Sequence, residues 1–301
     1  MTKRSIKHRR RQLQRKRQLQ RRLAIAALSA FIVFLIAGIE IRHYRTVKKQ
    51  VTATSDVKKA SAQKTGNSSN KSDTASDETT KEETEEERLA RVKKKAETKK
   101  YPKDVIELLS KNPETVDFVE DYETKKDEPV AKNIGSDYVE GQIPKLIQWD
   151  ERWGYKKYGT SIVAASGCGP TCLSMVFIKL TGNSAITPAT VADYGNQLGA
   201  LDDENNTLWS FMSEAATNWG IQCAEGMLTE EQVQAELAAG HPIICSVGPG
   251  DFTQIGHFIV LASYNNGQVE VRDPFNKERT EKTWNYKDIE GQFVEMWTYS
   301  K

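Results

Sequence analysis

The amino-acid sequence predicts an α+β domain in residues 101–301, preceded by a stalk and a single transmembrane helix. Three observations carry this prediction. Residues 23–39 are apolar and contain no charged side chain, which is typical of a bilayer span. All nine Pro and all six Trp lie after residue 100, so only the second part of the chain can build a sizeable core. In that part, apolar residues recur first at helical spacing and then at strand spacing.

Charge divides the chain at the same place. Residues 1–100 carry 27 Lys and Arg against 11 Asp and Glu, whereas residues 101–301 carry 16 against 30. An acidic globular segment argues against nucleic acid as a partner, and we expect none.

The basic residues are concentrated directly before the apolar run. Residues 1–22 contain eleven Lys or Arg and no acidic residue. Because basic flanks stay on the cytoplasmic side, we expect a cytoplasmic tail over 1–22, a transmembrane helix over 23–41 and the rest of the chain outside the cell membrane. A cleaved signal peptide is the alternative, but the residues around Gly38 form a poor cleavage site. The membrane is therefore an expected partner, through residues 23–41 and the basic tail.

Residues 42–100 are predicted to form a disordered or partly helical stalk. The segment up to residue 87 is polar and almost lacks large apolar residues, so it cannot repay its ordering entropy. Residues 84–99 place acids before bases, as a helix dipole favours. A helical lead-in follows over 101–140, with one helix over 103–111 and a short one over 115–122. The main domain is expected over 143–301.

Cys168 is the candidate nucleophile. It lies between two glycines, directly before the apolar helical pattern of Cys172, Leu173, Val176, Phe177 and Leu180. Pro170 suits the first turn of a helix, and Gly182 suits its C-terminal cap. Cys168 is therefore expected at a helix N-terminus, where free N–H groups favour a thiolate and an oxyanion.

His257 is the candidate base, at the start of a predicted strand over 257–264. Asn266-Gly267 is a hairpin signal, and a second strand returns to Asp273-Pro274. Asp273 therefore shares one end of the hairpin with His257. An ideal register, however, puts Asn276 opposite His257 and turns Asp273 to the other face, unless a bulge or strand exit intervenes. The pattern leaves both Asp273 and Asn276 as candidates for orienting the imidazole.

The other cysteines and histidine of the main domain are expected to be structural. Cys172, Cys223 and Cys245 lie in apolar segments and are interpreted as packing residues, and His241 as a structural histidine. Trp209 and Trp219 fall in an apolar helical pattern and are expected in the core. No set of ligands with metal-binding spacing is present, so we expect neither a metal ion nor another cofactor.

At these residues the chain resembles the bacteriocin-processing, double-glycine cysteine peptidases, in the branch not fused to a transporter. The resemblance covers about residues 101–301 and rests on four motifs: Gln148-x-Asp150-x-Arg152-Trp153, Gly167-Cys168-Gly169-Pro170-Thr171, Gly256-His257-Phe258 and Asp273-Pro274. It implies a papain-like fold, with a helical part that carries Cys168 packed on an antiparallel sheet that carries His257. It also implies Asp273 as the orienting residue.

One position departs from these relatives. Those that cleave double-glycine leaders place a Gln oxyanion donor six residues before the Cys, where this chain has Ile162. Gln148 is the nearest upstream Gln and becomes the candidate donor. This departure, together with the lack of a transporter segment in the sequence, argues against leader peptides as the substrate.

The resemblance and the residues together predict an extracytoplasmic cysteine peptidase that uses Cys168, His257 and Asp273 and an acyl-enzyme. Its substrate would be a peptide, a protein or a cell-wall peptide. The same residues would equally suit a transpeptidase, which passes the acyl group to an amine. A non-catalytic module that binds the wall or a protein from its stalk is the alternative of a different class.

Overall fold

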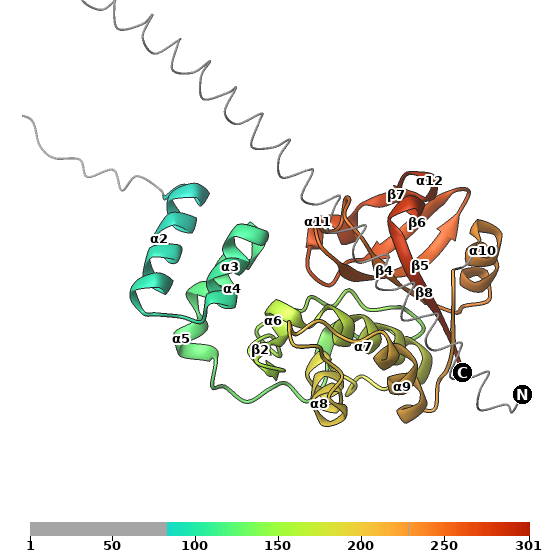
Figure 1. Ribbon diagram of the computed structural model, residues 1–301, viewed down its shortest axis with the longest axis horizontal. Helices are drawn as coiled ribbons and strands as arrows, with labels where there is room; N and C mark the ends of the chain where they lie inside the picture. Colours follow the sequence, from blue (N-terminus) through green and yellow to red (C-terminus); the bar gives the residue numbers. More distant parts are fainter. Residues whose placement is uncertain (1–82, 228) are drawn as a thin grey trace, which may run out of the picture. The chain divides into compact units, whose positions relative to one another are not determined.

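The computed structural model describes residues 83–227 and 229–301 (Figure 1). The expected cytoplasmic tail over 1–22, the expected transmembrane helix over 23–41 and most of the expected stalk lie outside the described residues. Within the part of the chain that is described, no helix is both long and apolar enough to cross a bilayer. The described residues belong to one compact unit.

The chain first forms a bundle of short helices, which we call the lead-in. Its elements are α2 (Glu85–Thr98), α3 (Lys103–Lys111), the 3-10 helix η1 (Pro113–Thr115), α4 (Val116–Glu120) and α5 (Tyr122–Lys125). A capping box between Thr84 and Glu87 starts α2. The helix itself lies where the acid-first pattern predicted one. Val92 and Ala96 of α2 are fully buried in one cluster with α3 and α4. Residues 85–98 therefore pack as part of the folded unit, although the sequence placed them in the stalk.

The next segment contains the helix that begins at Cys168. The elements are η2 (Gly135–Asp137), β1 (Lys157–Tyr158), β2 (Ser161–Ile162), α6 (Val163–Ser166), α7 (Cys168–Thr181), α8 (Pro188–Leu198) and α9 (Ser210–Asn218). Gly182 ends α7 in the left-handed conformation, with φ of 72°, as expected for a C-terminal cap. From Cys172 to Phe177 every residue of α7 is buried, so α7 is the central helix of this part.

The rest of the chain forms a six-stranded antiparallel sheet in the order β3-β8-β4-β5-β6-β7. The strands are β3 (Gln222–Glu225), β4 (Ile243–Val247), β5 (His257–Asn265), β6 (Gln268–Arg272), β7 (Thr283–Asn285) and β8 (Phe293–Ser300). The connections contain α10 (Glu230–Ala238), α11 (Lys277–Glu281), α12 (Tyr286–Ile289) and η3 (Glu290–Gln292). The chain is thus α+β, with helices first and an antiparallel sheet after them, as predicted.

Both faces of the sheet are covered. Phe258 and Val260 of β5 pack in one cluster with α7, α8 and α9, whereas Ile259 and Leu261 pack with α10 and α12 on the other face (Figure 1). The alternation follows from the period of two residues in a strand. β5, which begins at His257, therefore packs through Phe258 and Val260 against α7, the helix that begins at Cys168.

The expectation that Trp209 lies in the core is wrong, because this residue lies at the start of α9 with 46% of its surface exposed. The amphipathic pattern could not show that the helix begins one residue after Trp209. Cys223 and Cys245 are free thiols on β3 and β4, and β8 lies between these strands, so they are too far apart to pair.

Candidate active site

Cys168 is the first residue of α7 and is half-buried. The short helix α6 ends two residues earlier, so the chain turns sharply at Gly167. A Cβ atom on Gly169 would lie 2.8 Å from the hydroxyl of Thr207, so this position tolerates no side chain. Among the described residues, no acceptor is found for the N–H of Cys168, as expected at a helix start. The thiol therefore lies beside unpaired backbone donors.

The structure brings His257 and Asp273 together. The imidazole Nε2 lies 2.8 Å from Oδ1 of Asp273, and the two side chains are 9% and 0% exposed. The side chain of Cys168 is also close enough to the same imidazole to raise the pKa of His257. Because Nε2 is engaged by the carboxylate, Nδ1 is the ring nitrogen that remains for the thiol. Cys168, His257 and Asp273 thus lie together in one site.

A β-bulge explains why Asp273 faces His257. The hairpin closes on Asn266 and Gly267, with φ of 48° and 78°, as the sequence predicted. Ala262 is then an extra residue in β5, because Leu261 pairs with Val271 but Ser263 pairs with Glu270. Continued to the end of the hairpin, this shifted register sets Asp273 opposite Ile259, on the same face as His257. The bulge lies within β5 and not beside Pro274.

Asn276, the other candidate for orienting the imidazole, has a different place. It precedes α11, and its side-chain oxygen accepts a hydrogen bond from the N–H of Arg279 at 2.7 Å. This is the contact of an N-terminal helix cap. Among the described residues, it is Asp273 and not Asn276 that hydrogen-bonds to His257.

Several residues that the sequence did not single out hold Asp273. Its Oδ1 also accepts from the N–H of Phe275 at 2.8 Å, and its Oδ2 lies 3.2 Å from Nη1 of Arg279. Its backbone N–H donates to Thr280 at 2.9 Å. The helix-cap motif at Asn276 was the one available signal for this loop, since it places Arg279 and Thr280 in the first turn of α11.

The charges of the pair are strongly coupled. Burial alone would lower the pKa of His257, but the adjacent carboxylate of Asp273 and the bonds to Asp273 and Cys168 raise this pKa to about 10. Burial likewise opposes the charge of Asp273, yet the imidazolium and the N–H of Phe275 bring the pKa of Asp273 below its usual value. Both shifts favour the charged forms, an imidazolium beside a carboxylate.

The remaining cysteines are poor nucleophiles. Cys172 and Cys245 are fully buried, and burial raises the pKa of both thiols well above the usual value. Burial also raises the pKa of Cys223 to about 11. At neutral pH these three thiols remain protonated, in agreement with their interpretation as packing residues.

Gln148, the candidate oxyanion donor, binds both the segment before Cys168 and the loop after Asp273. Its Nε2 donates to the carbonyl of Ala164 at 2.8 Å, and its backbone N–H donates to the carbonyl of Pro274 at 2.7 Å. The side chain is 2% exposed, and no partner of its Oε1 is found in the described part of the chain. The side-chain amide nitrogen Nε2 carries two N–H groups, and the carbonyl of Ala164 accepts from one of them.

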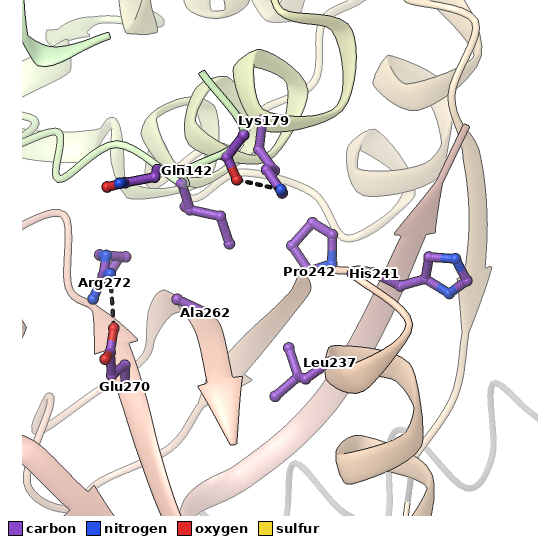
Figure 2. A pocket seen from close by; sticks show the side chains of 11 residues that line it. Gln142, Lys179, Leu237, His241, Pro242, Ala262, Glu270 and Arg272 are labelled. Carbon is purple, nitrogen blue, oxygen red and sulfur yellow. Dashed lines mark hydrogen bonds and ion pairs between the residues drawn. The ribbon is translucent and has the colours of Figure 1, made fainter. Parts of the chain in front are cut away.

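A cavity of about 310 Å³ lies elsewhere between the helices and the sheet (Figure 2). Ala262 at the bulge, Lys179 of α7, Leu237 of α10 and Arg272 of β6 are among the side chains that line it. Its two cations are already engaged, because Lys179 donates to Gly141 and Arg272 bonds to Glu270. Neither Cys168 nor His257 lines this cavity.

No group of three or more metal-ligating side chains with suitable geometry is found among the residues that the structure describes. His241, the other histidine of the main domain, lies 2.7 Å from Glu236.

Comparisons with known proteins give a family match. Residues 141–301, more than half of the chain, match the sequence model of the Peptidase C39-like family. No curated protein matches the chain.

Three solved structures are similar to parts of the chain. The peptidase domain of Streptococcus ComA, a bifunctional ABC transporter involved in a quorum-sensing pathway, is 18% identical over 44% of this chain and 90% of its own, with a TM-score of 0.35. A protein described as a C39-like peptidase from Bacillus anthracis is 16% identical over 58% and 98%, with a TM-score of 0.36. A double-glycine-motif protease of an AMS/PCAT transporter, solved with the leader peptide, is 12% identical over 57% and 98%, with a TM-score of 0.31.

Proposed function

Because the chain belongs to the Peptidase C39-like family, we propose that it is a cysteine peptidase that cleaves amide bonds through Cys168, His257 and Asp273. One observation carries the proposal. The imidazole of His257 is held between the carboxylate of Asp273, at 2.8 Å, and the half-buried thiol at the start of α7. This order of nucleophile, base and orienting group is the one that acyl transfer requires.

Acylation starts from a thiolate paired with an imidazolium. The sulfur of Cys168 attacks the carbonyl carbon of the substrate, and the electron pair of the C=O bond moves to the oxygen. The oxyanion is stabilised by the N–H of Cys168, for which the described residues supply no acceptor, and by Gln148. As the C–N bond breaks, the imidazolium of His257 gives its proton to the leaving amine, and a thioester remains on Cys168.

Deacylation uses the same groups in the reverse sense. Neutral His257 takes a proton from water while the water oxygen attacks the thioester carbonyl. The C–S bond then breaks, the acid product leaves, and the thiolate and imidazolium are restored. Asp273 keeps Nε2 protonated and the ring oriented in both steps.

The substrate is a peptide, a protein or a cell-wall peptide. If an amine replaced water in the second step, the same residues would act as a transpeptidase. We place the reaction outside the cytoplasm, because the charge of residues 1–22 and the apolar run over 23–41 favour that orientation. A non-catalytic module on a stalk would not need a buried carboxylate behind an imidazole, since burying that charge is costly.

The proposal is tested with the full chain and with Cys168→Ala on a library of peptides and wall fragments. We expect hydrolysis by the unchanged protein and none by Cys168→Ala. An aldehyde analogue of a cleaved peptide should label Cys168 stoichiometrically, and His257→Ala should slow that labelling. Hydrolysis that survives in Cys168→Ala would rule out this mechanism. Products joined to an added amine would instead identify a transpeptidase.

A further inference from the structure

The loop that carries Asp273 is held from two directions. On one side, residues of the loop itself and of α11 hold its start, through Phe275, Arg279 and Thr280. On the other side, residues far earlier in the chain hold its middle. The carbonyl of Phe275 accepts from Nδ2 of Asn112 and from Nε1 of Trp149, both at 2.7 Å.

Glu114 continues this second set of contacts. Its carboxylate accepts from the backbone N–H of Lys277 at 2.9 Å and from that of Glu278 at 3.3 Å. These N–H groups open the first turn of α11, where they have no acceptor within the helix. Asn112 and Glu114 therefore bind three successive parts of the loop that follows Asp273.

Phe275 connects the lead-in with the imidazole. Its side chain packs against the apolar cluster of the lead-in, and its ring contacts that of His257 edge-on, with centroids 6.4 Å apart. Its N–H binds the same carboxylate oxygen that binds His257. A displacement of Phe275 would thus reach both partners of the charge pair.

Contacts within the lead-in hold the two residues that bind the loop. Asn112 is 2% exposed, and its Oδ1 accepts from the N–H of Glu114 at 3.1 Å, which fixes the side-chain amide. In addition, Arg88 and Arg91 of α2 form ion pairs with Glu120 at the end of α4. None of these residues lies within residues 141–301, the segment that matches the family model.

We propose that Asn112 and Glu114 are positioning residues for the His257–Asp273 pair, so that the lead-in completes the active site from outside the family domain. This inference rests on the proposed function. The two residues contact neither the thiol nor the imidazole; they act through Phe275 and the first turn of α11. The charged or titratable groups that face His257 are Asp273 and Cys168, with Arg279 behind Asp273.

Asn112→Asp is the sharpest variant, because it keeps the oxygen that caps η1 and removes the N–H donor to Phe275. Glu114→Gln removes the charge at the start of α11. Glu107→Gln is the matched control, since it makes the same chemical change on an exposed face of α3 that does not contact the loop.

The readout is the rate of alkylation of Cys168 by iodoacetamide against pH in the full chain, measured by mass spectrometry on the Cys168 peptide. We expect Asn112→Asp and Glu114→Gln to move the alkaline transition of this profile to lower pH, and Glu107→Gln to leave it unchanged. Hydrolysis should fall about 10- to 100-fold in kcat/KM for Asn112→Asp, as for a misplaced catalytic group.

A folded Asn112→Asp protein with an unchanged alkylation profile and unchanged kcat/KM would overturn the inference. The alkylation assay needs no substrate, so it remains decisive even if no hydrolysis is found. Failure of the proposed function has a different signature, because the profile would then be insensitive to His257→Ala as well.

Discussion

At the scale of the residue, the proposed function depends on one buried charge pair. His257 and Asp273 are almost entirely removed from solvent, and each keeps the other charged. A buried carboxylate is tolerated here because four groups contact it or its backbone: His257, Phe275, Arg279 and Thr280. A substitution that removes one charge of this pair should therefore change the pH dependence of the activity.

Replacing Asp273 by Asn tests this coupling. The substitution removes the negative charge that raises the pKa of His257 to about 10, so the imidazole should lose its proton at lower pH. His257 would then lose, at a lower pH, the charge that the proposed reaction needs. We expect the alkaline limb of the activity profile to move toward neutral pH and kcat/KM at pH 7 to fall by about two orders of magnitude. An unshifted limb would show that Asp273 does not set the imidazole charge.

Gly169 permits a second test at this scale. An added methyl group would lie within 3.0 Å of three side-chain atoms of Thr207, which itself bonds to Tyr158. Gly169→Ala should lower the free energy of unfolding by about 1–3 kcal/mol, measured by denaturant titration. Gly291→Ala, at a position with open space around it, is the control and should change stability little. Equal stability of the two variants would contradict the close approach.

At the scale of the element, periodicity and turn signals predicted most of the site. The helix from Cys168 to Gly182, the strand from His257 and the Asn266-Gly267 turn all lie where the pattern put them. The bulge at Ala262 could not be predicted, because alanine carries no bulge signal and the alternation around it is unremarkable. Family resemblance, and not spacing, had pointed to Asp273.

Deleting Ala262 tests the bulge directly. Without Ala262, the pair Leu261–Val271 follows directly on the pair Ser263–Glu270, so the ladder becomes regular and Asp273 stays opposite Ile259, on the face of His257. We therefore expect the deletion to keep most of the hydrolysis, while the protein still folds. Circular dichroism and near-ultraviolet spectra would establish folding. A folded deletion variant with the low activity of Asp273→Asn would show that the bulge itself, and not only the pairing, positions Asp273.

At the scale of the whole molecule, the lead-in and the main domain both contribute side chains to one apolar cluster. Asn112 and Phe275 are separated by 163 residues, so no local pattern could have joined them. The sequence correctly ended a helix at Asn112-Pro113 but gave no reason to connect it with the loop after Asp273. The same limitation explains why α2 was assigned to the stalk, since its partners lie in α3 and α4.

Truncation separates the stalk from the folded unit. A chain that begins at residue 101 loses Val92 and Ala96, which are fully buried against α3 and α4. We expect it to be less stable by about 3 kcal/mol or more than a chain that begins at residue 80. Thermal unfolding of the two chains, monitored by circular dichroism, measures the difference. Equal midpoints would place the true boundary after α2.

The pairing of this hairpin also constrains how it can vary in evolution. Side chains alternate in a strand, so whether His257 and Asp273 meet depends on the number of paired positions that separate each of them from the turn. Ala262 is not a paired position, so its loss would leave the meeting intact, whereas a single insertion or deletion at a paired position of one strand would turn one of the two side chains to the other face. In related chains, therefore, hairpins with and without the extra residue should keep the same number of paired positions between the turn and the aspartate.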